Sequence, residues 1–426
     1  MENERIMDEN KATSLDEFEK QLKQNVDGGA SSLADFEQQL KSNVGATQTQ
    51  QGQKQTVKVK KNIVLSFPSD FTGCGNIRNI VPLNYITNLY GKAGSLICMI
   101  APFYIRQVDI LARSRALFFQ RQMNEQQFNI VKNYKDLQTD LKYKMIWDMD
   151  DNIWGKNEMQ GGDKDSGVPA YNFGFKNIDN GIRKFSVKIM ELMDTCCLST
   201  EYLRHIVVDK LGIQTNCVVM PNSIPKFFWG GIKRPDKTKR IEKPKVLITS
   251  SPTHYHNELK KKGDFNNAWL TWILDSVKQD RIDLVCMGGL PFFFEEIKDK
   301  IKVINWVSSF DYHNVVKNQR ADICIGPLVP NGFNHSKSDI KYIESCASST
   351  PFIGTTFNGD DNPSPYDNCL LTVKEDCTVD DIEDIVDKLK EPEFHNKIKN
   401  EQFSILDRDG RWTESPEYIK KWLAII

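Results

Sequence analysis

The sequence predicts an α/β protein with two α/β domains that follow a polar N-terminal tail. Short apolar, β-branched runs alternate with helix-like segments from Val57 onward. A basic, proline-containing segment interrupts this alternation, as an interdomain linker does. The stretch 321–354 is typical of a strand, loop, helix and strand, which form a βαβ unit. The expected parts are a tail at 1–56, a first domain at 57–225, a linker at 226–245, a second domain at 246–400, and a C-terminal helix at 401–426 that packs back on the first domain.

Composition is that of an ordinary globular protein. With 426 residues, 39% hydrophobic and 27% charged, the chain can build two or three cores. The formal net charge of -1 gives no overall attraction to nucleic acid or anionic lipid. The N-terminus has no apolar signal-peptide region, and no run of about eighteen apolar residues occurs, so neither a signal peptide nor a membrane span is expected. The ten cysteines are scattered without a CxxC pair, which favours reduced core thiols in a cytoplasmic protein.

The tail contains an internal repeat, SLDEFEKQLKQNV from Ser14 and SLADFEQQLKSNV from Ser32. Each copy begins like a capping box and places leucines and a phenylalanine on one helical face. A helix of about twelve residues is marginal alone. Two interpretations stay open: a disordered or partly helical solvated tail, or a duplicated docking motif in residues 14–44 for a protein partner.

The first domain is expected to open with a buried strand at Lys60–Phe67, followed by PSDFTGCGNIR. Gly73 and Gly75 would let the backbone approach a ligand closely, although a plain tight turn fits as well. The next predicted elements are a strand at Ser95–Ala101, a partly apolar segment at Gln107–Phe119, a helix at Glu125–Leu141, a strand at Lys144–Trp147, a helix at Ile182–Met193, and strands at Thr195–Ser199 and Cys217–Met220.

Three carboxylates, Asp148, Asp150 and Asp151, follow the strand at Lys144–Trp147 in the run DMDDNIWG. Ligands bind at this end of strands in open α/β sheets. The cluster could hold a divalent cation, contact sugar hydroxyls without metal, or form an Asx-type turn and helix cap. The Gly-, Asp- and Asn-rich residues 156–176 next to it have the composition of a surface loop that covers a substrate.

The second domain is expected to begin with the strand KVLITSS at Lys245, which runs into SPTHYHNELKKKGDF. His254 and His256 have no third ligand at regular spacing, so hydrogen bonding or phosphate contact is favoured over metal. Lys260 to Lys262 are either a solvated charge run or a source of one phosphate partner. A helix at Asn267–Val277, a strand at Ile282–Met287 and the segment Lys302–Trp306 follow.

In the stretch 321–354 an apolar run ends at Gly326-Pro327, and a polar loop leads into a helix with Lys337, Lys341 and Glu344. The loop and the start of this helix are suited to an anion such as a diphosphate.

The motifs DMDDNIW, PNSIPKFFW, ITSSPTHYHNELKKKGDF and the stretch 321–354, in this order and spacing, resemble retaining glycosyltransferases of the GT-B fold. The resemblance is to the branch with SPTH and KSDIKYLE-like motifs, including transferases of large phages, and it covers about residues 60–420. It implies two facing Rossmann-like domains with a cleft between them. The C-terminal domain would hold a nucleotide-diphosphate sugar, and the N-terminal domain would hold the acceptor of the transferred hexose or pentose.

The resemblance also implies roles for individual residues. Wider family members carry two glutamates eight positions apart; Glu344 matches the second, which contacts the donor ribose, and Ser336 stands at the first. The residues expected at the donor are Ser251, Thr253, His254, Lys262, Asn334, Lys337, Ser338 and Glu344. Those expected at the acceptor are Gly73, Gly75, Arg78 and Asp148. Catalytic roles are expected for Asp150, Asp151 and Lys337. Retaining GT-B enzymes need no metal, so the nucleotide sugar is the only co-substrate expected and a divalent cation is not.

The acceptor stays open. Some phage transferases modify hydroxymethylated bases in DNA, which would need a basic groove. The candidates for such a groove are Lys58, Lys60, Lys61, Lys233, Arg234, Lys237, Lys239 and Arg240. A glycan, a protein or a small molecule are the other options, in the host cytoplasm if the protein is phage-encoded. The alternative function is a catalytically silent GT-B protein that acts as a scaffold through its repeated N-terminal motif.

Overall fold

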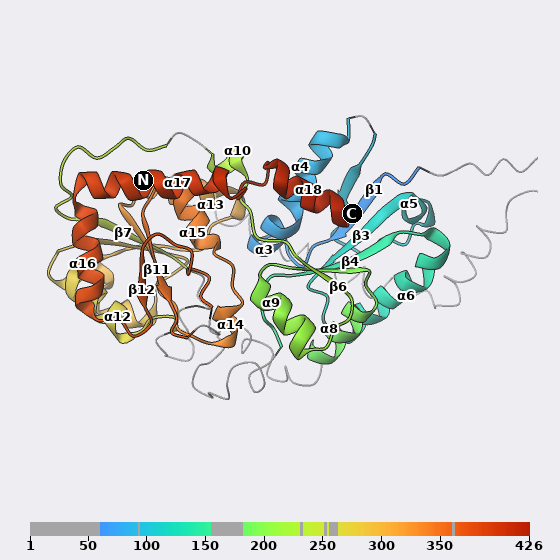
Figure 1. The fold of residues 1–426 in the computed structure, drawn as a ribbon, viewed down its shortest axis with the longest axis horizontal. Helices are drawn as coiled ribbons and strands as arrows, with labels where there is room; N and C mark the ends of the chain where they lie inside the picture. The colour runs from blue at the N-terminus through green and yellow to red at the C-terminus, as the bar shows by residue number, and fades with distance from the viewer. Residues whose placement is uncertain are drawn as a thin grey trace, which may run out of the picture. The chain divides into compact units, whose positions relative to one another are not determined.

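The computed structural model describes residues 60–92, 94–154, 182–230, 233–250, 254, 263–359 and 363–426. Residues 60–426 form one compact unit around two six-stranded sheets, and every pair of neighbouring strands in them is parallel (Figure 1). The predicted α/β class with two Rossmann-like sheets is confirmed.

The first sheet has the strand order β2-β1-β3-β4-β5-β6. Its strands are apolar on both faces because helices cover both sides: Leu65 and Phe67 enter one core, and Val64 between them enters the other. The strands are β1 (Ile63–Phe67), β2 (Ile97–Ile100), β3 (Ser114–Gln120), β4 (Lys144–Met149), β5 (Thr195–Leu198) and β6 (Asn216–Val219).

Helices of the first half pack on both faces of this sheet. A capping box of Asn124 and Gln127 starts the longest of them, α6, at the residue that the sequence predicts. Val131 of α6 and Ile189 of α8 share one core. The helical segments are α3 (Gly73–Gly75), η1 (Asn76–Ile80), α4 (Val81–Tyr90), α5 (Val108–Arg113), α6 (Glu125–Leu141), α8 (Ile182–Glu191), α9 (Glu201–His205) and η3 (Ile206–Lys210).

The second sheet has the strand order β12-β11-β10-β7-β8-β9. When β7 is counted as strand 1 and the sheet is read from β9 to β12, the order is 3-2-1-4-5-6, the doubly wound arrangement of dinucleotide-binding domains. The strands are β7 (Lys245–Thr249), β8 (Asp283–Met287), β9 (Lys302–Ile304), β10 (Ile323–Gly326), β11 (Phe352–Thr356) and β12 (Thr372–Lys374).

The first helix of the second half, α10, lies in the segment that was expected to be a linker. The expected boundary at residue 400 falls inside α17. Leu406 of α17 packs in a core of the second sheet. In contrast, α18 packs on the first sheet, where the ring centroids of Trp422 and Phe118 of β3 lie 5.2 Å apart. The helices are α10 (Lys226–Trp229), α12 (Asn267–Lys278), η5 (Phe292–Lys300), α13 (Ser309–Gln319), α14 (Gly332–His335), α15 (Ile340–Ala347), α16 (Val379–Lys390), α17 (Pro392–Arg408) and α18 (Pro416–Ile425).

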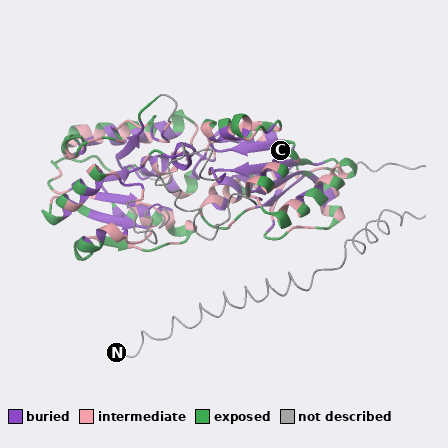
Figure 2. Cartoon of the chain, turned by 90° about the horizontal axis from the view of Figure 1, so that it is seen from below, coloured by how far each residue is buried: buried purple, intermediate pink, exposed green. Residues whose placement is uncertain are grey.

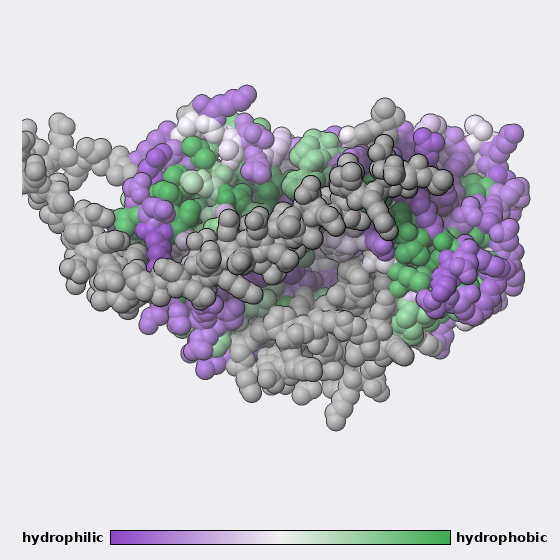
Figure 3. All heavy atoms as spheres, turned by 180° about the vertical axis from the view of Figure 1, so that it is seen from behind, coloured by the Kyte–Doolittle hydropathy of each residue, from purple (hydrophilic) through white to green (hydrophobic). Residues whose placement is uncertain are grey.

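Burial follows this layering: the strands of both sheets are buried, and exposed residues lie on the surrounding helices and loops (Figure 2). On the face drawn in Figure 3, hydrophobic residues surface in separate patches between hydrophilic ones. Among the described helices, none has the length and apolar character needed to cross a membrane. All ten cysteines are free thiols.

Candidate functional site

The second sheet reverses its strand order between β7 and β10, because β8 and β9 lie beyond β7 while β11 and β12 lie beyond β10. In open parallel sheets, ligands bind outside the carboxyl ends of the two strands at such a point. The segment after β7 contains His254, and the segment after β10 contains Asn334 and Lys337. Three of the residues predicted for the donor thus come from the two connections at this edge.

A hydrogen-bonded chain joins these two segments. His254 Nδ1 lies 2.5 Å from Asp264 Oδ2, and His254 Nε2 lies 3.1 Å from Lys337 Nζ. Asn334 Nδ2 donates to Asp264 Oδ1 over 2.8 Å. The ammonium of Lys337 also lies 4.3 Å from the ring centroid of Phe333, which favours a cation there.

Charges in this chain are set by burial and by the lysines. Burial, Lys337 and Lys341 lower the pKa of His254 to about 3, so its imidazole is neutral at pH 7. Burial alone would raise the pKa of Asp264, but His254, Lys337 and Asn334 lower it to about 2, so it is a carboxylate. A neutral imidazole beside a carboxylate carries its proton on Nδ1, which leaves the lone pair of Nε2 to accept from Lys337.

Lys341 and Glu344 occupy one face of α15, three residues apart. Lys341 Nζ donates to Ser250 Oγ at the end of β7 over 2.7 Å, and burial lowers its pKa to about 8. Glu344, 8% exposed, accepts from the hydroxyl of Tyr312 over 3.0 Å, and burial raises its pKa to about 7. Lys341, to which the sequence analysis gave no site role, is close enough to Glu344 to oppose this rise in pKa.

The residues on either side of Lys337 differ in their surroundings, since Ser336 is enclosed and Ser338 lines the same pocket as Lys337. Ser336 is fully buried, and its hydroxyl donates to Phe333 O over 2.7 Å, so it cannot replace the missing glutamate as a ligand. Ser338 Oγ accepts from Asn222 Nδ2 over 2.7 Å. This bond joins Ser338 to the connection after β6, and because an accepting hydroxyl can still donate, its contact with the donor stays a prediction.

At the corresponding edge of the first sheet, Arg121 lies between the carboxylates of Asp150 and Asp151. Its Nε donates to Asp150 Oδ1 over 2.7 Å, and its Nη2 lies 2.5 Å from Asp151 Oδ2 and 3.3 Å from Cys74 Sγ. The ligand atoms of Cys74, Asp150 and Asp151 lie within 4.8 Å of one another, but the guanidinium neutralises this cluster in place of a metal ion. Sequence reasoning missed Arg121, which follows β3 with no motif around it.

Arg78 and Asp148, both expected at the acceptor, pair with each other instead. The two side chains are each 1% exposed, and Arg78 Nη1 also donates to Asn222 Oδ1 over 3.1 Å. Burial raises the pKa of Asp148, although the neighbouring Arg78 opposes this shift. The two side chains are thus enclosed and bonded to each other, and their role at an acceptor stays a prediction.

Of the two glycines expected to let a ligand approach, Gly75 makes a close contact within the chain. Gly75 N donates to Asp70 Oδ1 over 3.1 Å, and a Cβ on Gly75 would lie 1.7 Å from Asp70 O. Asp70 Oδ1 also accepts from Thr72 N over 2.8 Å, so this carboxylate caps the helix that starts at Gly73. A Cβ on Gly73 would meet nothing within 4 Å. The close approach at Gly75 is therefore made by the chain itself.

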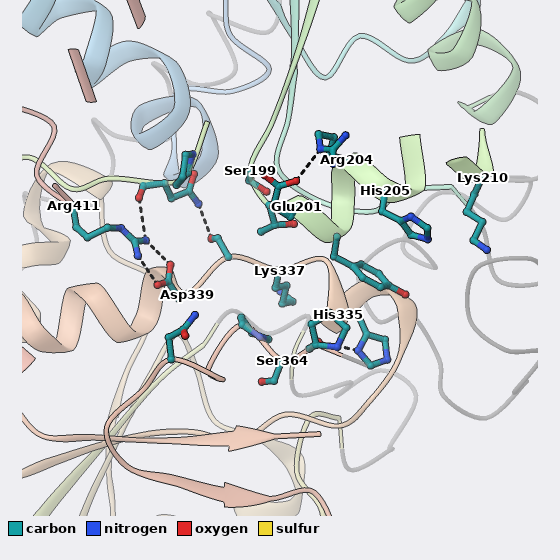
Figure 4. A pocket seen from close by; sticks show the side chains of 18 residues that line it. Ser199, Glu201, Arg204, His205, Lys210, His335, Lys337, Asp339, Ser364 and Arg411 are labelled. Carbon is teal, nitrogen blue, oxygen red and sulfur yellow. Dashed lines mark hydrogen bonds and ion pairs between the residues drawn. The ribbon is translucent and has the colours of Figure 1, made fainter. Parts of the chain in front are cut away.

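A pocket of ≈ 880 Å³ lies among connections at the carboxyl ends of strands from both sheets (Figure 4). Its polar lining includes two ion pairs, Arg204 with Glu201 and Arg411 with Asp339, and the side chain of Lys337. The volume lies in the range of small-molecule sites. Its lining residues are Ser199, Thr200, Glu201, Tyr202, Arg204, His205, Lys210, Pro221, Asn222, His335, Lys337, Ser338, Asp339, Pro363, Ser364, Pro365, Asn368 and Arg411.

Four of the eight basic residues considered for DNA are engaged within the chain. Lys61 donates to three backbone carbonyls, and Arg234 Nη1 donates to Ala321 O over 2.7 Å. Lys237 pairs with Asp322 at 2.6 Å, and Arg240 pairs with the residue that precedes α17. Lys60, Lys233 and Lys239 are exposed. The contacts of Arg234, Lys237 and Arg240 join the segment 233–240 to residues that precede β10 and α17.

Several predicted residues lie outside the described part of the chain: Ser251, Thr253, Lys262, His256, Lys58 and the repeat at 14–44. Asp264, which joins His254 to Asn334, had no place in the sequence-based site. The sequence feature that could have pointed to Asp264 is its position directly after Gly263, at the end of the histidine- and lysine-rich segment that follows β7.

Comparisons with known proteins agree with this architecture. The chain is similar to a glycosyltransferase from Rickettsia africae ESF-5, with 11% identity, 86% of this chain and 97% of that chain covered, and a TM-score of 0.53. It is similar to sucrose-phosphate synthase from Thermosynechococcus elongatus, with 9% identity, 86% and 100% covered, and a TM-score of 0.52. It is also similar to Anabaena HepE in complex with UDP-glucose, with 6% identity, 85% of this chain and 100% of that chain covered, and a TM-score of 0.50.

No protein-family model matches the sequence, and a search of curated proteins gave no match. At such low identities the structural likeness shows the fold alone. The chain has the GT-B fold that its motifs predict, with one Rossmann-like sheet in each half.

Proposed function

We propose that this protein is a glycosyltransferase that takes a sugar from a UDP-sugar, with the donor held at the carboxyl ends of β7 and β10. The observation that carries the proposal is the convergence of Lys337, Lys341, His254 and Glu344 at the reversal point of the second sheet. Two lysines there can stabilise the negative charge that a departing diphosphate develops. The UDP-glucose complex of Anabaena HepE, which shares the fold, supports UDP as the nucleotide.

Each residue has a separate role in this proposal. Lys337 contacts the diphosphate, because its ammonium is aligned by a neutral imidazole that adds no competing charge. Glu344 accepts from the ribose hydroxyls, with Tyr312 fixing one of its oxygens. Retention of configuration and the division into a donor domain at 246–400 and an acceptor domain at 57–225 enter the proposal through the sequence resemblance.

The acceptor is proposed to reach the pocket beside Lys337. That pocket is lined by hydroxyl, carboxylate and guanidinium groups, which suit a hydroxylated small molecule or glycan end. A DNA acceptor has less support, because Arg234, Lys237 and Arg240 of the basic segment are bonded within the chain. In the acidic cluster, Asp150 and Asp151 are proposed to bind acceptor hydroxyls, the role that the sequence resemblance gives to this region.

A thermal-shift and calorimetric titration with UDP, UDP-glucose and other nucleotide sugars tests the donor site. A UDP-sugar should raise the Tm of the wild-type protein, since it binds the folded state. Lys337→Met should weaken UDP binding roughly tenfold or more, since it removes charge-assisted contacts to phosphate. Lys278→Met is the matched control, because Lys278 lies at the far end of α12 and pairs with Glu296. Equal UDP affinity of wild type and Lys337→Met would overturn the site.

A catalytically silent GT-B protein is the second candidate, favoured by one observation. The position of the family's first glutamate holds Ser336, whose hydroxyl is buried against Phe333 O. Release of UDP from a bound UDP-sugar, measured with glycans and polyols as acceptors, separates the two candidates. UDP-sugar binding without turnover across the acceptor panel would favour the silent protein.

A further inference from the structure

Two residues support Lys337 by hydrogen bonds, His254 and Asn334, and both are bonded to the carboxylate of Asp264. It is 2% exposed and accepts two hydrogen bonds, one on each oxygen. His254 Nδ1 donates to Oδ2 over 2.5 Å, and Asn334 Nδ2 donates to Oδ1 over 2.8 Å. A buried carboxylate that is bonded on both oxygens holds its partners in fixed orientations.

The first support acts on the ammonium of Lys337. Because Asp264 accepts only, it keeps the imidazole proton of His254 on Nδ1. The unprotonated Nε2 then accepts from Lys337 Nζ over 3.1 Å. With the proton on Nε2 instead, an N–H would face an ammonium, and two donors would displace each other.

The second support acts on the backbone of Lys337. Asn334 is fully buried, and its Nδ2 also donates to Val329 O over 2.9 Å. The backbone oxygen of Asn334 accepts from the backbone N–H of Lys337 over 3.3 Å. By fixing the side chain of Asn334, Asp264 therefore also fixes the turn from which Lys337 starts.

We propose that Asp264 is a positioning residue that orients Lys337 toward the diphosphate of the donor, through the Nδ1–H tautomer of His254 and through the side chain of Asn334. The inference rests on the proposed function for its ligand, a nucleoside diphosphate. The tautomer itself is a property of the protein without ligand.

The tautomer is tested by ¹⁵N NMR of histidine-labelled protein, with the His254 signals assigned by their loss in His254→Gln. Unliganded wild type should show Nδ1 protonated and Nε2 unprotonated from pH 6 to pH 8. Asp264→Asn should lose this pattern, because an amide has one acceptor oxygen for two donors. A wild-type His254 with its proton on Nε2 would overturn the proposal without any variant.

A double-variant cycle tests whether Asp264 acts through His254. Asp264→Asn should weaken UDP binding roughly tenfold to a hundredfold, as expected when hydrogen bonds to a charged group are lost. In the His254→Gln background the same change should have a much smaller effect on UDP binding, because Asp264 and His254 belong to one chain of hydrogen bonds that ends at Lys337. Additive losses would show that Asp264 does not act through His254 and would overturn that part of the proposal.

Asp322→Asn is the matched control. Asp322 is a largely buried carboxylate of the same sheet that accepts from Lys237 Nζ and Lys245 N over 2.6 and 2.8 Å, just before β10. Its loss should lower stability but leave the His254 tautomer and UDP affinity unchanged. If wild type shows the expected tautomer and binds no UDP or UDP-sugar, the proposed function fails while the hydrogen-bonded arrangement stands. If wild type binds UDP and Asp264→Asn binds equally well, the positioning role alone fails.

Discussion

Arg78 and Asp148 form an ion pair in which each side chain is only 1% exposed to solvent. Replacing Arg78 by Met leaves a buried carboxylate without its partner, which costs about 3–5 kcal/mol of unfolding free energy. We therefore expect Arg78→Met to shift urea unfolding strongly toward lower denaturant concentration. UDP affinity, measured at a temperature where the variant is folded, should stay near that of wild type.

The control for this prediction is the double variant Arg78→Met/Asp148→Leu. Removing both charges together leaves no unpaired group, so the double variant should recover much of the lost stability. If the single variant loses less than about 1 kcal/mol, the pair behaves like an exposed ion pair. That result would reopen a role for the two residues in binding an acceptor.

Gly73 and Gly75 allow a comparison of two alanine substitutions in one turn. A Cβ on Gly75 would lie 1.7 Å from Asp70 O, whereas a Cβ on Gly73 would meet nothing within 4 Å. Gly75→Ala should therefore force the backbone apart and destabilise the protein by more than about 2 kcal/mol, as overpacking does. Gly73→Ala should change the unfolding free energy by less than about 1 kcal/mol. Urea unfolding of both variants checks this, and equal stability would contradict the geometry.

Arg121 suggests a third experiment, since it neutralises Asp150 and Asp151 next to Cys74. Arg121→Ala should remove this charge and leave three ligand atoms close enough for one cation. We expect the variant to bind Mn²⁺ more tightly than wild type by at least tenfold, measured by electron paramagnetic resonance of free Mn²⁺. The double variant Arg121→Ala/Asp150→Asn should lose that gain. Equally tight Mn²⁺ binding by the wild type would contradict the neutralising role of Arg121.

The sequence was sufficient for many of the strands and for the long helix after β3, because apolar runs and caps are local signals, but it did not predict α13, β12 or α16. The helix at Glu125–Leu141 has the predicted limits, since Asn124 and Gln127 cap it and Lys142 ends it with a positive φ of 54°. The boundary expected at residue 400 instead lies within α17. Helical periodicity shows which face of a helix is apolar, but it does not show which of two sheets that face covers.

For the candidate site, sequence reasoning found the polar residues at strand ends but not how they pair. Asp264 and Asn334 are 70 positions apart, and so are Arg78 and Asp148. Such pairs depend on which connections the strand order brings together, and no local pattern carries that information. Asp148 was therefore expected to bind an acceptor, and Asp264 was missed.

His254 leads to a prediction about stability and pH. Its pKa in the folded protein is about 3, below the ordinary 6.5, because it is buried beside Lys337 and Lys341, an effect that Asp264 only partly opposes. As the pH falls below 6.5, the unfolded chain gains a proton that the folded protein does not bind. The unfolding free energy should then fall by up to about 1.4 kcal/mol per pH unit on account of this residue.

His254→Gln removes this contribution, so its unfolding free energy should decline less steeply than that of wild type between pH 6.5 and pH 4. Other buried histidines titrate in both proteins, and the difference between the two curves isolates His254. Parallel curves for wild type and His254→Gln in urea unfolding would show that His254 takes up a proton while folded. Its Nε2 would then be a donor, which is incompatible with accepting a hydrogen bond from Lys337.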